Sequence, residues 1–379
     1  MEHVIAHDWI ALVEELGPTL ATNAATADQH DTFVQANYAL LKEHRFFSAL
    51  IPEELGGAGS SHRAMCDTLR TMAHYCSSTA LALSMHQHLV AANVWKYKRG
   101  QGAADMLQKV AAQQLILVST GAGDWLESSG QVEKTEGGYL VTAQKHFASQ
   151  APVGNVLVTS APYEAPEAGW QVLHFPVPFR TEGLTVLDDW YTLGMRGTGS
   201  HTVRLDRVFV PESAIVLKRP RGTYHPVWNV ILTVAMPLIM AVYVGIAERA
   251  EQLVLATLRA KAQRPPHVPY LVGEMHNALT TARVLWQDTI RLCQNFDFQP
   301  EDAQGIAILT RKTEIANAAI RTVEKAMEAL GGASFFRHQE LERLFRDVKA
   351  GPFHPLPEKP QQRFTGDYLL DPAQTLSFF

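Results

Sequence analysis

The stretch GGYLVTAQKHFASQAPVGNVLVTSA, residues 137–161, contains short β-branched runs separated by glycine, proline and polar turns. Similar runs occur from about 116 to 215, among them WQVLHFPV and HTVRLDRVFVP. On either side of this region, apolar residues recur every three and four positions, as in amphipathic helices. Helices, then strands, then helices, with no βαβ alternation, predict an α+β protein and exclude a Rossmann architecture.

The change of period divides the chain into three parts. Residues 1–115 are expected to form an all-α domain, residues 116–220 a small antiparallel, barrel-like β-domain, and residues 221–379 a helical domain. With 379 residues, 46% of them hydrophobic, the chain can bury a sizeable core.

Charge and cysteine content exclude several classes of protein. The formal net charge is −5 and the 33 basic residues are scattered, so a nucleic-acid partner is not expected. The three cysteines, Cys66, Cys76 and Cys293, have no paired metal spacing and are interpreted as buried small side chains in a reducing compartment. No signal peptide is visible in MEHVIAHDWIALVEEL, which predicts a cytoplasmic protein.

Residues 227–247, VWNVILTVAMPLIMAVYVGIA, are apolar over a length that could span a bilayer. Asn229, Thr233 and the central Pro237 weaken that interpretation, and no other segment comes near the same length. A buried core helix is favoured, because long apolar helices also occur inside large proteins.

Two short segments suggest a ligand site near the strands. STGAGD, residues 119–124, follows an apolar run, and its glycines would let the backbone approach a ligand to which Ser119, Thr120 and Asp124 could hydrogen-bond. A plain tight turn is the alternative.

KHFAS, residues 145–149, places Phe147 and Ser149 two positions apart, and therefore on one face of an extended strand. A flat polar ring could lie against that face, with Phe147 covering it and Ser149 meeting a heteroatom. The alternative is an ordinary half-buried strand.

Five segments, taken together, resemble the acyl-CoA dehydrogenase superfamily in order and spacing. They are SALIPEELGGAG (48–59), STGAGDWLESSG (119–130), residues 137–161, LGMRGTGSHTVRLDRVFVPESAIV (193–216) and EALGGASFFRHQELERLFRDVKAG (328–351). The resemblance implies a flavoprotein with an N-terminal helical domain, a middle β-domain and a C-terminal four-helix bundle, assembled as a homotetramer. The apolar segment 227–247 would be the first bundle helix.

The resemblance also implies residues that contact the flavin. Ser119, Thr120, Gly123 and Asp124 match positions near the flavin ring and the substrate, and Phe147, Ala148 and Ser149 match the triplet beside the reactive edge of the ring. Arg196, in a glycine-flanked turn, is placed with the cofactor-binding residues, and Leu330, Gly331 and Gly332 match a segment that approaches the flavin of a neighbouring subunit.

The expected catalytic base of an acyl-CoA dehydrogenase is missing. Counted from Arg346 and Asp347, the glutamate position is occupied by Pro355 and the preceding tyrosine position by His354. The alternative glutamate position, in NVILTVAM, contains no carboxylate. The segment AQRPPHVPYLVGEM lacks the phenylalanine-glycine that would hold the far end of a neighbour's FAD. FAD is therefore expected to bind weakly there, or FMN to replace it.

This pattern is similar to a branch of the superfamily, the two-component monooxygenases, which take reduced flavin from a separate reductase. A histidine is common there at the position of His354, and a second one lies on a helix facing the flavin, a role that His86 or His88 could take. These two point about 200° apart on a helix, so a shared metal site is not expected. Glu358 is the alternative base. Histidine suits proton transfer because its ordinary pKa is near neutrality.

Three functions remain open from the sequence. The first is a monooxygenase acting on an aromatic or sulfur compound, which the missing glutamate slightly favours. The second is CH–CH dehydrogenation of an acyl thioester with a relocated base. The third is a non-catalytic scaffold that binds flavin or an acyl group.

Overall fold

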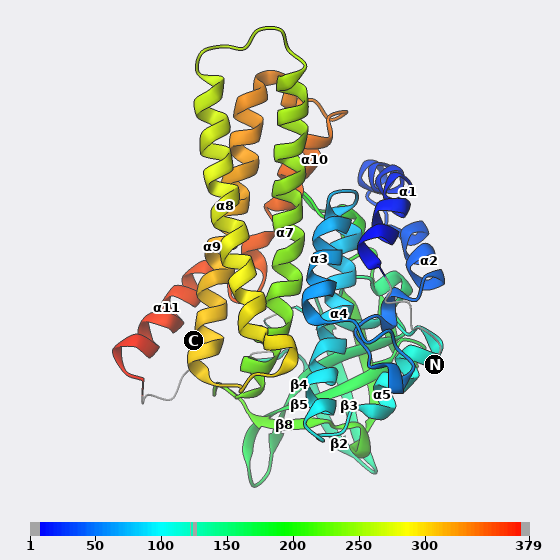
Figure 1. The fold of residues 1–379 in the computed structure, drawn as a ribbon. Helices are drawn as coiled ribbons and strands as arrows, with labels where there is room; N and C mark the ends of the chain where they lie inside the picture. Colours follow the sequence, from blue (N-terminus) through cyan, green and yellow to red (C-terminus); the bar gives the residue numbers. More distant parts are fainter. Residues whose placement is uncertain (1–7, 122, 124–126, 373–379) are drawn as a thin grey trace, which may run out of the picture.

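The computed structural model describes residues 8–121, 123 and 127–372, and these form three parts in chain order (Figure 1). Helices make up the N-terminal part, two sheets the middle part, and long helices the C-terminal part. This order confirms the predicted fold class.

The N-terminal part contains five α-helices. They are α1 (Trp9–His30), α2 (Gln35–Glu43), α3 (His62–Ala73), α4 (Ser77–Lys98) and α5 (Ala104–Gln113). Over most of its length α4 is buried, because small or apolar residues occupy nearly every side of STALALSMHQHLV. It packs against α3, α7 and β1, so the histidines of α4 lie where the three parts meet.

The middle part consists of two four-stranded sheets. One has the order β1 (Leu117–Ser119), β4 (Val156–Ala165), β5 (Gly169–Pro178), β8 (Leu217–Pro220), and the other β2 (Gln131–Thr135), β3 (Gly138–Lys145), β7 (Val203–Pro211), β6 (Leu184–Val186). The β1–β4 pair is parallel, so the prediction of a purely antiparallel domain is wrong there. The long connection between these strands, which includes β2 and β3, leaves them free to run in the same direction.

Three long helices dominate the C-terminal part, α7 (Val227–Arg259), α8 (Val268–Cys293) and α9 (Asp302–Leu330). Among the described residues, α7 is the one helix long and apolar enough to cross a membrane. Its most apolar 18-residue stretch is 94% buried in the fold. The apolar segment is thus a core helix, as predicted, and its side chains pack against α3, α4, α8 and α9.

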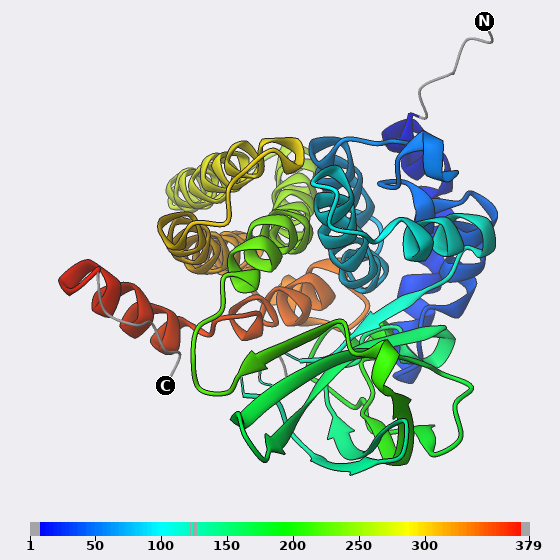
Figure 2. The same cartoon turned by 90° about the horizontal axis from the view of Figure 1, so that it is seen from below.

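The fourth side of the predicted bundle is divided into two shorter helices. These are α10 (Glu340–Val348) and α11 (Glu358–Leu370). The loop between them contains Pro352, Pro355 and Pro357, which cannot donate backbone hydrogen bonds and so interrupt a helix. In Figure 2, α10 lies between the long helices and the sheets, whereas α11 extends away from them. The proline loop between them packs against α7 and α9.

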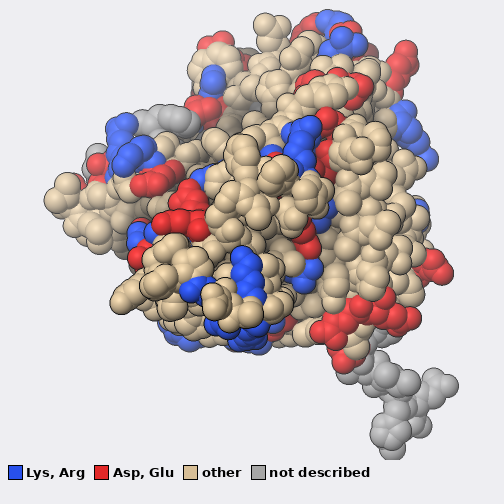
Figure 3. Space-filling view, turned by 90° about the horizontal axis from the view of Figure 1, so that it is seen from above, with Lys and Arg blue, Asp and Glu red and all other residues tan. Residues whose placement is uncertain are grey.

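The basic residues and the cysteines lie as the sequence analysis predicted. In Figure 3, Lys and Arg side chains are interspersed with acidic ones on the face shown. Cys66, Cys76 and Cys293 are free thiols and are buried.

Candidate active site at the junction of sheets and helices

His354 follows the short 3₁₀ helix η8 (Gly351–Phe353) and has the extended backbone that Pro355 predicts (φ −68°, ψ 152°). Its Nε2 lies 2.6 Å from the hydroxyl oxygen of Tyr243 on α7. Tyr243 is fully buried, and burial raises its pKa well above the usual range, so the phenol keeps its proton and donates a hydrogen bond to Nε2. The neutral His354 ring then carries its own proton on Nδ1.

Burial, together with smaller contributions from Lys312 and His88, lowers the pKa of His354 to about 3. The expectation that this histidine titrates near neutrality is therefore wrong. Desolvation and two neighbouring basic groups disfavour the imidazolium ion. At pH 7 the ring is neutral and offers a hydrogen-bond donor instead of a strong base.

The two histidines of α4 have different surroundings. His86 uses both ring nitrogens for backbone contacts: Nε2 lies 2.8 Å from the Phe47 carbonyl oxygen, and Nδ1 accepts from Leu117 N–H at 3.0 Å. This arrangement ties α4 to β1 and gives His86 a structural part. His88 Nδ1 lies 3.3 Å from the Ser84 carbonyl oxygen, and His88 is near enough to His354 to shift its pKa. Of the two histidines, His88 is the one whose charge would affect the pKa of His354.

Glu358, the alternative base, is the first residue of α11. Its Oε1 accepts from Gln362 Nε2 at 2.9 Å, and its Oε2 lies 3.4 Å from Asn317 Nδ2. Its side chain keeps 38% of its surface exposed. The carboxylate therefore faces amides at the surface of α9 and α11.

The segment KHFAS is not one continuous strand. β3 ends at Lys145, and Phe147 has the left-handed backbone (φ 58°) that bulky side chains rarely adopt. Phe147 is 61% exposed with its ring edge against Trp190, whereas Ser149 is 7% exposed. The prediction that both side chains share one strand face is wrong, because the chain turns between them. Strained residues of this kind are frequent at functional sites.

Ser149 belongs to a chain of three hydroxyl groups. Thr198 Oγ1 donates to the Met195 carbonyl oxygen at 2.9 Å, so it accepts from Ser200 at 2.7 Å. Ser200 in turn accepts from Ser149 at 2.8 Å. The hydroxyl proton of Ser149 is thereby used in the hydrogen bond to Ser200, and the Ser149 oxygen can accept a hydrogen bond from another group.

The segment that begins at Ser119 lies beside Phe147. Ser119 and Thr120 are both buried, and Thr120 Oγ1 is 3.3 Å from Thr159 Oγ1 on β4. Gly121 N–H donates to the His146 carbonyl at 2.9 Å, and a Cβ at Gly121 would lie 3.0 Å from the Phe147 ring. The glycine thus permits a close approach between this turn and the Phe147 ring. Gly123 is exposed, and Asp124 lies outside the described residues.

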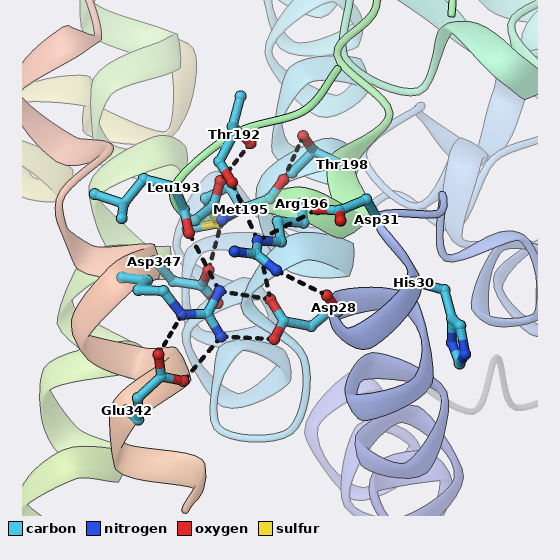
Figure 4. A network of polar contacts seen from close by, with 12 residues as sticks. Asp28, His30, Asp31, Thr192, Leu193, Met195, Arg196, Thr198, Glu342 and Asp347 are labelled. Atoms are coloured by element: carbon cyan, nitrogen blue, oxygen red, sulfur yellow. Dashed lines mark hydrogen bonds and ion pairs between the residues drawn. The ribbon is translucent and has the colours of Figure 1, made fainter. Parts of the chain in front are cut away.

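Arg196, placed from the sequence among the cofactor-binding residues, is engaged by α1 (Figure 4). Its Nε is 3.3 Å from Asp31 Oδ1, and its Nη1 donates to the Asp28 carbonyl at 3.3 Å. Arg346 of α10 binds both carboxylate oxygens of Asp28, at 2.7 and 2.6 Å, and also Glu342. The network joins the N-terminal helices, the 193–200 turn and α10.

Asp347 on α10 hydrogen-bonds the 193–200 turn and the start of α4. Its Oδ1 accepts from Met195 N–H at 2.5 Å and its Oδ2 from the Ser77 hydroxyl, while burial raises its pKa. Asp347→Ala is expected to lower the free energy of unfolding by about 2 to 4 kcal/mol, because two buried donors lose their acceptor. Urea denaturation measures the loss. Asp347→Asn, which keeps one acceptor oxygen, should lose clearly less, and equal losses would contradict this explanation.

Leu330, Gly331 and Gly332 form the end of α9 and the start of the next 3₁₀ turn. Gly331 has φ 68°, and both glycines are exposed. The neighbouring Phe335 and Phe336 are 81% and 60% exposed. In the isolated chain this segment is therefore an open apolar surface.

Sequence reasoning missed Tyr243, Ser200 and Lys312. Tyr243 is a polar residue within the apolar α7, and Ser200 lies in the GMRGTGS turn from which only Arg196 was singled out. Lys312 of α9 is 1% exposed. The available signal was a charged residue at a position where the helical spacing of Leu309 and Ala316 calls for an apolar one.

The arrangement fits the flat ring of a flavin. The exposed Phe147 ring offers an aromatic face, the Ser149 oxygen an acceptor, and the turn at Gly121 a close backbone approach. His88 on α4 and His354 after η8 are neutral rings held by other elements. Phe147, Ser149 and the 119–121 segment would hold the flavin, and the flavin would supply the redox chemistry.

Comparisons with known proteins identify the family of this chain. Residues 13–114 match the family model described as acyl-CoA dehydrogenase, N-terminal domain, and residues 238–357 match acyl-CoA dehydrogenase, C-terminal domain. Fold and site define a flavin-dependent oxidoreductase. The chain belongs to the acyl-CoA dehydrogenase superfamily.

Similar proteins include enzymes whose names describe reactions other than acyl-CoA dehydrogenation. Amino sugar nitrososynthase RubN8 of Streptomyces rubradiris is 27% identical over 362 residues, which cover 91% of this chain and 85% of that protein. The oxygenase component of p-hydroxyphenylacetate 3-hydroxylase from Acinetobacter baumannii is 26% identical, covering 89% and 82%. The structure of KijD3 in complex with dTDP has a TM-score of 0.85 and 25% identity, with 97% of each chain covered.

Proposed function

We propose that the protein is a monooxygenase that takes up flavin in its reduced form. The observation that carries the proposal is His354, a neutral, hydrogen-bonded imidazole next to Pro355, which occupies the position where a dehydrogenase of this superfamily needs a carboxylate. A ring whose pKa is about 3 is too weak a base to remove the α-proton of an acyl thioester. A neutral N–H is suited to hydrogen-bonding an oxygen atom that develops negative charge.

The proposed reaction inserts one oxygen atom of O₂ into the substrate. Reduced flavin, when bound, supplies the two electrons, and with two protons the second oxygen atom leaves as water. In the site, Nδ1–H of His354 donates a hydrogen bond to the reacting oxygen, while Tyr243 keeps that proton on Nδ1. The hydroxyl chain fixes Ser149 as an acceptor, which matches the N–H that a flavin ring gains on reduction.

Relatives favour FMN and a nitrogen-containing substrate. One solved structure is described as KijD3 with FMN and a dTDP-amino sugar, and another as FMN-bound TdsC. Two amino sugar nitrososynthases are 27% and 28% identical to this chain. We therefore propose that reduced FMN comes from a separate reductase and that the substrate carries an electron-rich amine.

We also propose a cytoplasmic homotetramer. The exposed Phe335 and Phe336, next to Leu330–Gly332, support a subunit contact at this surface, because large exposed apolar side chains that cluster often mark interfaces.

Flavin titration under anaerobic conditions tests the proposed function. Reduced FMN is expected to bind at least about tenfold more tightly than oxidised FMN, since the N–H that the ring gains on reduction would donate to the Ser149 oxygen, and FAD is expected to bind more weakly than FMN. With a flavin reductase, an amine substrate and ¹⁸O₂, the product should gain one labelled oxygen. Tight co-purifying FAD that bleaches on addition of an acyl-CoA would instead establish a dehydrogenase, and failure to bind any flavin would leave a scaffold.

A further inference from the structure

Lys312 is a buried cation in the middle of α9. It is 1% exposed, and burial lowers its pKa to about 8. Among the described residues no carboxylate lies within ion-pair distance of it. Its Nζ donates instead to two backbone carbonyls, that of Pro352 at 3.2 Å and that of Leu356 at 3.0 Å. Burying a cation costs free energy, and the hydrogen bonds to these two carbonyls offset part of that cost.

The two carbonyls lie on either side of His354. This loop has three prolines, whose nitrogens carry no hydrogen, so its backbone can form few hydrogen bonds of its own. Gly351, at its start, packs 3.4 Å from the Tyr243 ring and from Ala316 Cβ, measured from an added Cβ position. Lys312 thus supplies from α9 the donors that the loop lacks.

We infer that Lys312 is a positioning residue, which fixes the loop on both sides of His354 and so places the imidazole against Tyr243 and the site. The inference rests on the proposed function for its catalytic consequence, but the anchoring of the loop does not. A displacement of about 1 Å at a reacting group can lower turnover by about a hundredfold.

Lys312→Met tests the inference, because it keeps the apolar stem and removes every donor. Hydrogen-exchange mass spectrometry should show exchange of the amides between 351 and 358 at least about tenfold faster than in the wild type, since local opening becomes easier. Turnover should fall about ten- to a hundredfold with the affinity for reduced FMN unchanged. Lys325→Met, at a lysine of the same helix that pairs with Glu274 and Glu328 instead of the proline loop, is the matched control and should leave exchange in this segment unchanged.

A double-mutant cycle with His354→Ala separates this inference from the proposed function. In the His354→Ala background, Lys312→Met should cost no further turnover while exchange still accelerates. Unchanged exchange in Lys312→Met would overturn the inference, whatever the activity. Faster exchange combined with full activity of His354→Ala would uphold the anchoring and refute the role of His354. Lys312→Gln, which retains one donor group, should give an intermediate exchange rate, and it replaces the methionine variant if that variant does not fold.

Discussion

His354→Ala is expected to lower the oxygenation rate by about a hundred- to a thousandfold, because the site loses the one donor that the proline loop presents. The affinity for reduced FMN should change little, since Phe147, Ser149 and the 119–121 segment belong to the middle part of the chain and not to the proline loop. Stopped-flow oxidation of the reduced complex and quantification of product measure the two effects separately. Uncoupled formation of hydrogen peroxide should increase correspondingly.

Two further variants show whether the donor itself matters. Tyr243→Phe removes the phenol that holds the proton on Nδ1, so the ring can adopt the other tautomer, and about a tenfold loss of turnover is expected. His267→Ala, in an exposed loop, is the control and should behave as the wild type. Unchanged turnover in His354→Ala, with flavin affinity preserved, would show that His354 is only a spacer.

The sequence predicted the three-part fold because that information is local. The change from helical to strand spacing near residue 116 is visible in the residues themselves, and the apolar α7 is recognisable as a core helix from its polar interruptions. The interruption of the fourth bundle side also follows from Pro352, Pro355 and Pro357. What the pattern could not give was the direction of β1, which depends on a strand almost forty residues later.

The site was predicted only in part, because its chemistry depends on contacts between distant segments. His354 could be placed by its proline neighbour, but its pKa depends on Lys312 and His88, which come from two other helices. The choice between His86 and His88 needed the Phe47 carbonyl and the Leu117 amide. Phe147 was expected within a strand, since a single left-handed residue leaves no periodic signal.

Acidification is expected to unfold the protein at a higher pH than is usual for its size, because the fold buries neutral histidines. His62, His86 and His88 are at most 4% exposed, and burial lowers the pKa of each to about 4. Below about pH 6.5 the unfolded chain binds protons that the native chain refuses. The unfolded state is then favoured increasingly as pH falls towards 4.

The expected effect is large relative to ordinary protein stability. Each fully buried histidine contributes a slope of about 1.4 kcal/mol per pH unit, so the three contribute about 4 kcal/mol per unit well below pH 6.5. His174 and His354, whose pKa values are lowered to about 3, add in the same direction. Asp347, whose pKa is raised, opposes the trend because the native carboxyl takes up its proton first. Glu248, whose pKa is lowered to about 2, adds to the loss only below about pH 4.5.

Urea denaturation of the flavin-free protein between pH 7.5 and 5 measures this dependence. His86→Gln, whose amide can still donate to the Phe47 carbonyl, should reduce the slope by one histidine's share, about 1.4 kcal/mol per pH unit. His267→Ala, which removes an exposed histidine instead of a buried one, is the matched control. A free energy of unfolding that stays constant from pH 7 to 5 would show that these histidines take up protons in the folded protein, and the neutral state assigned to His354 would have to be abandoned with theirs.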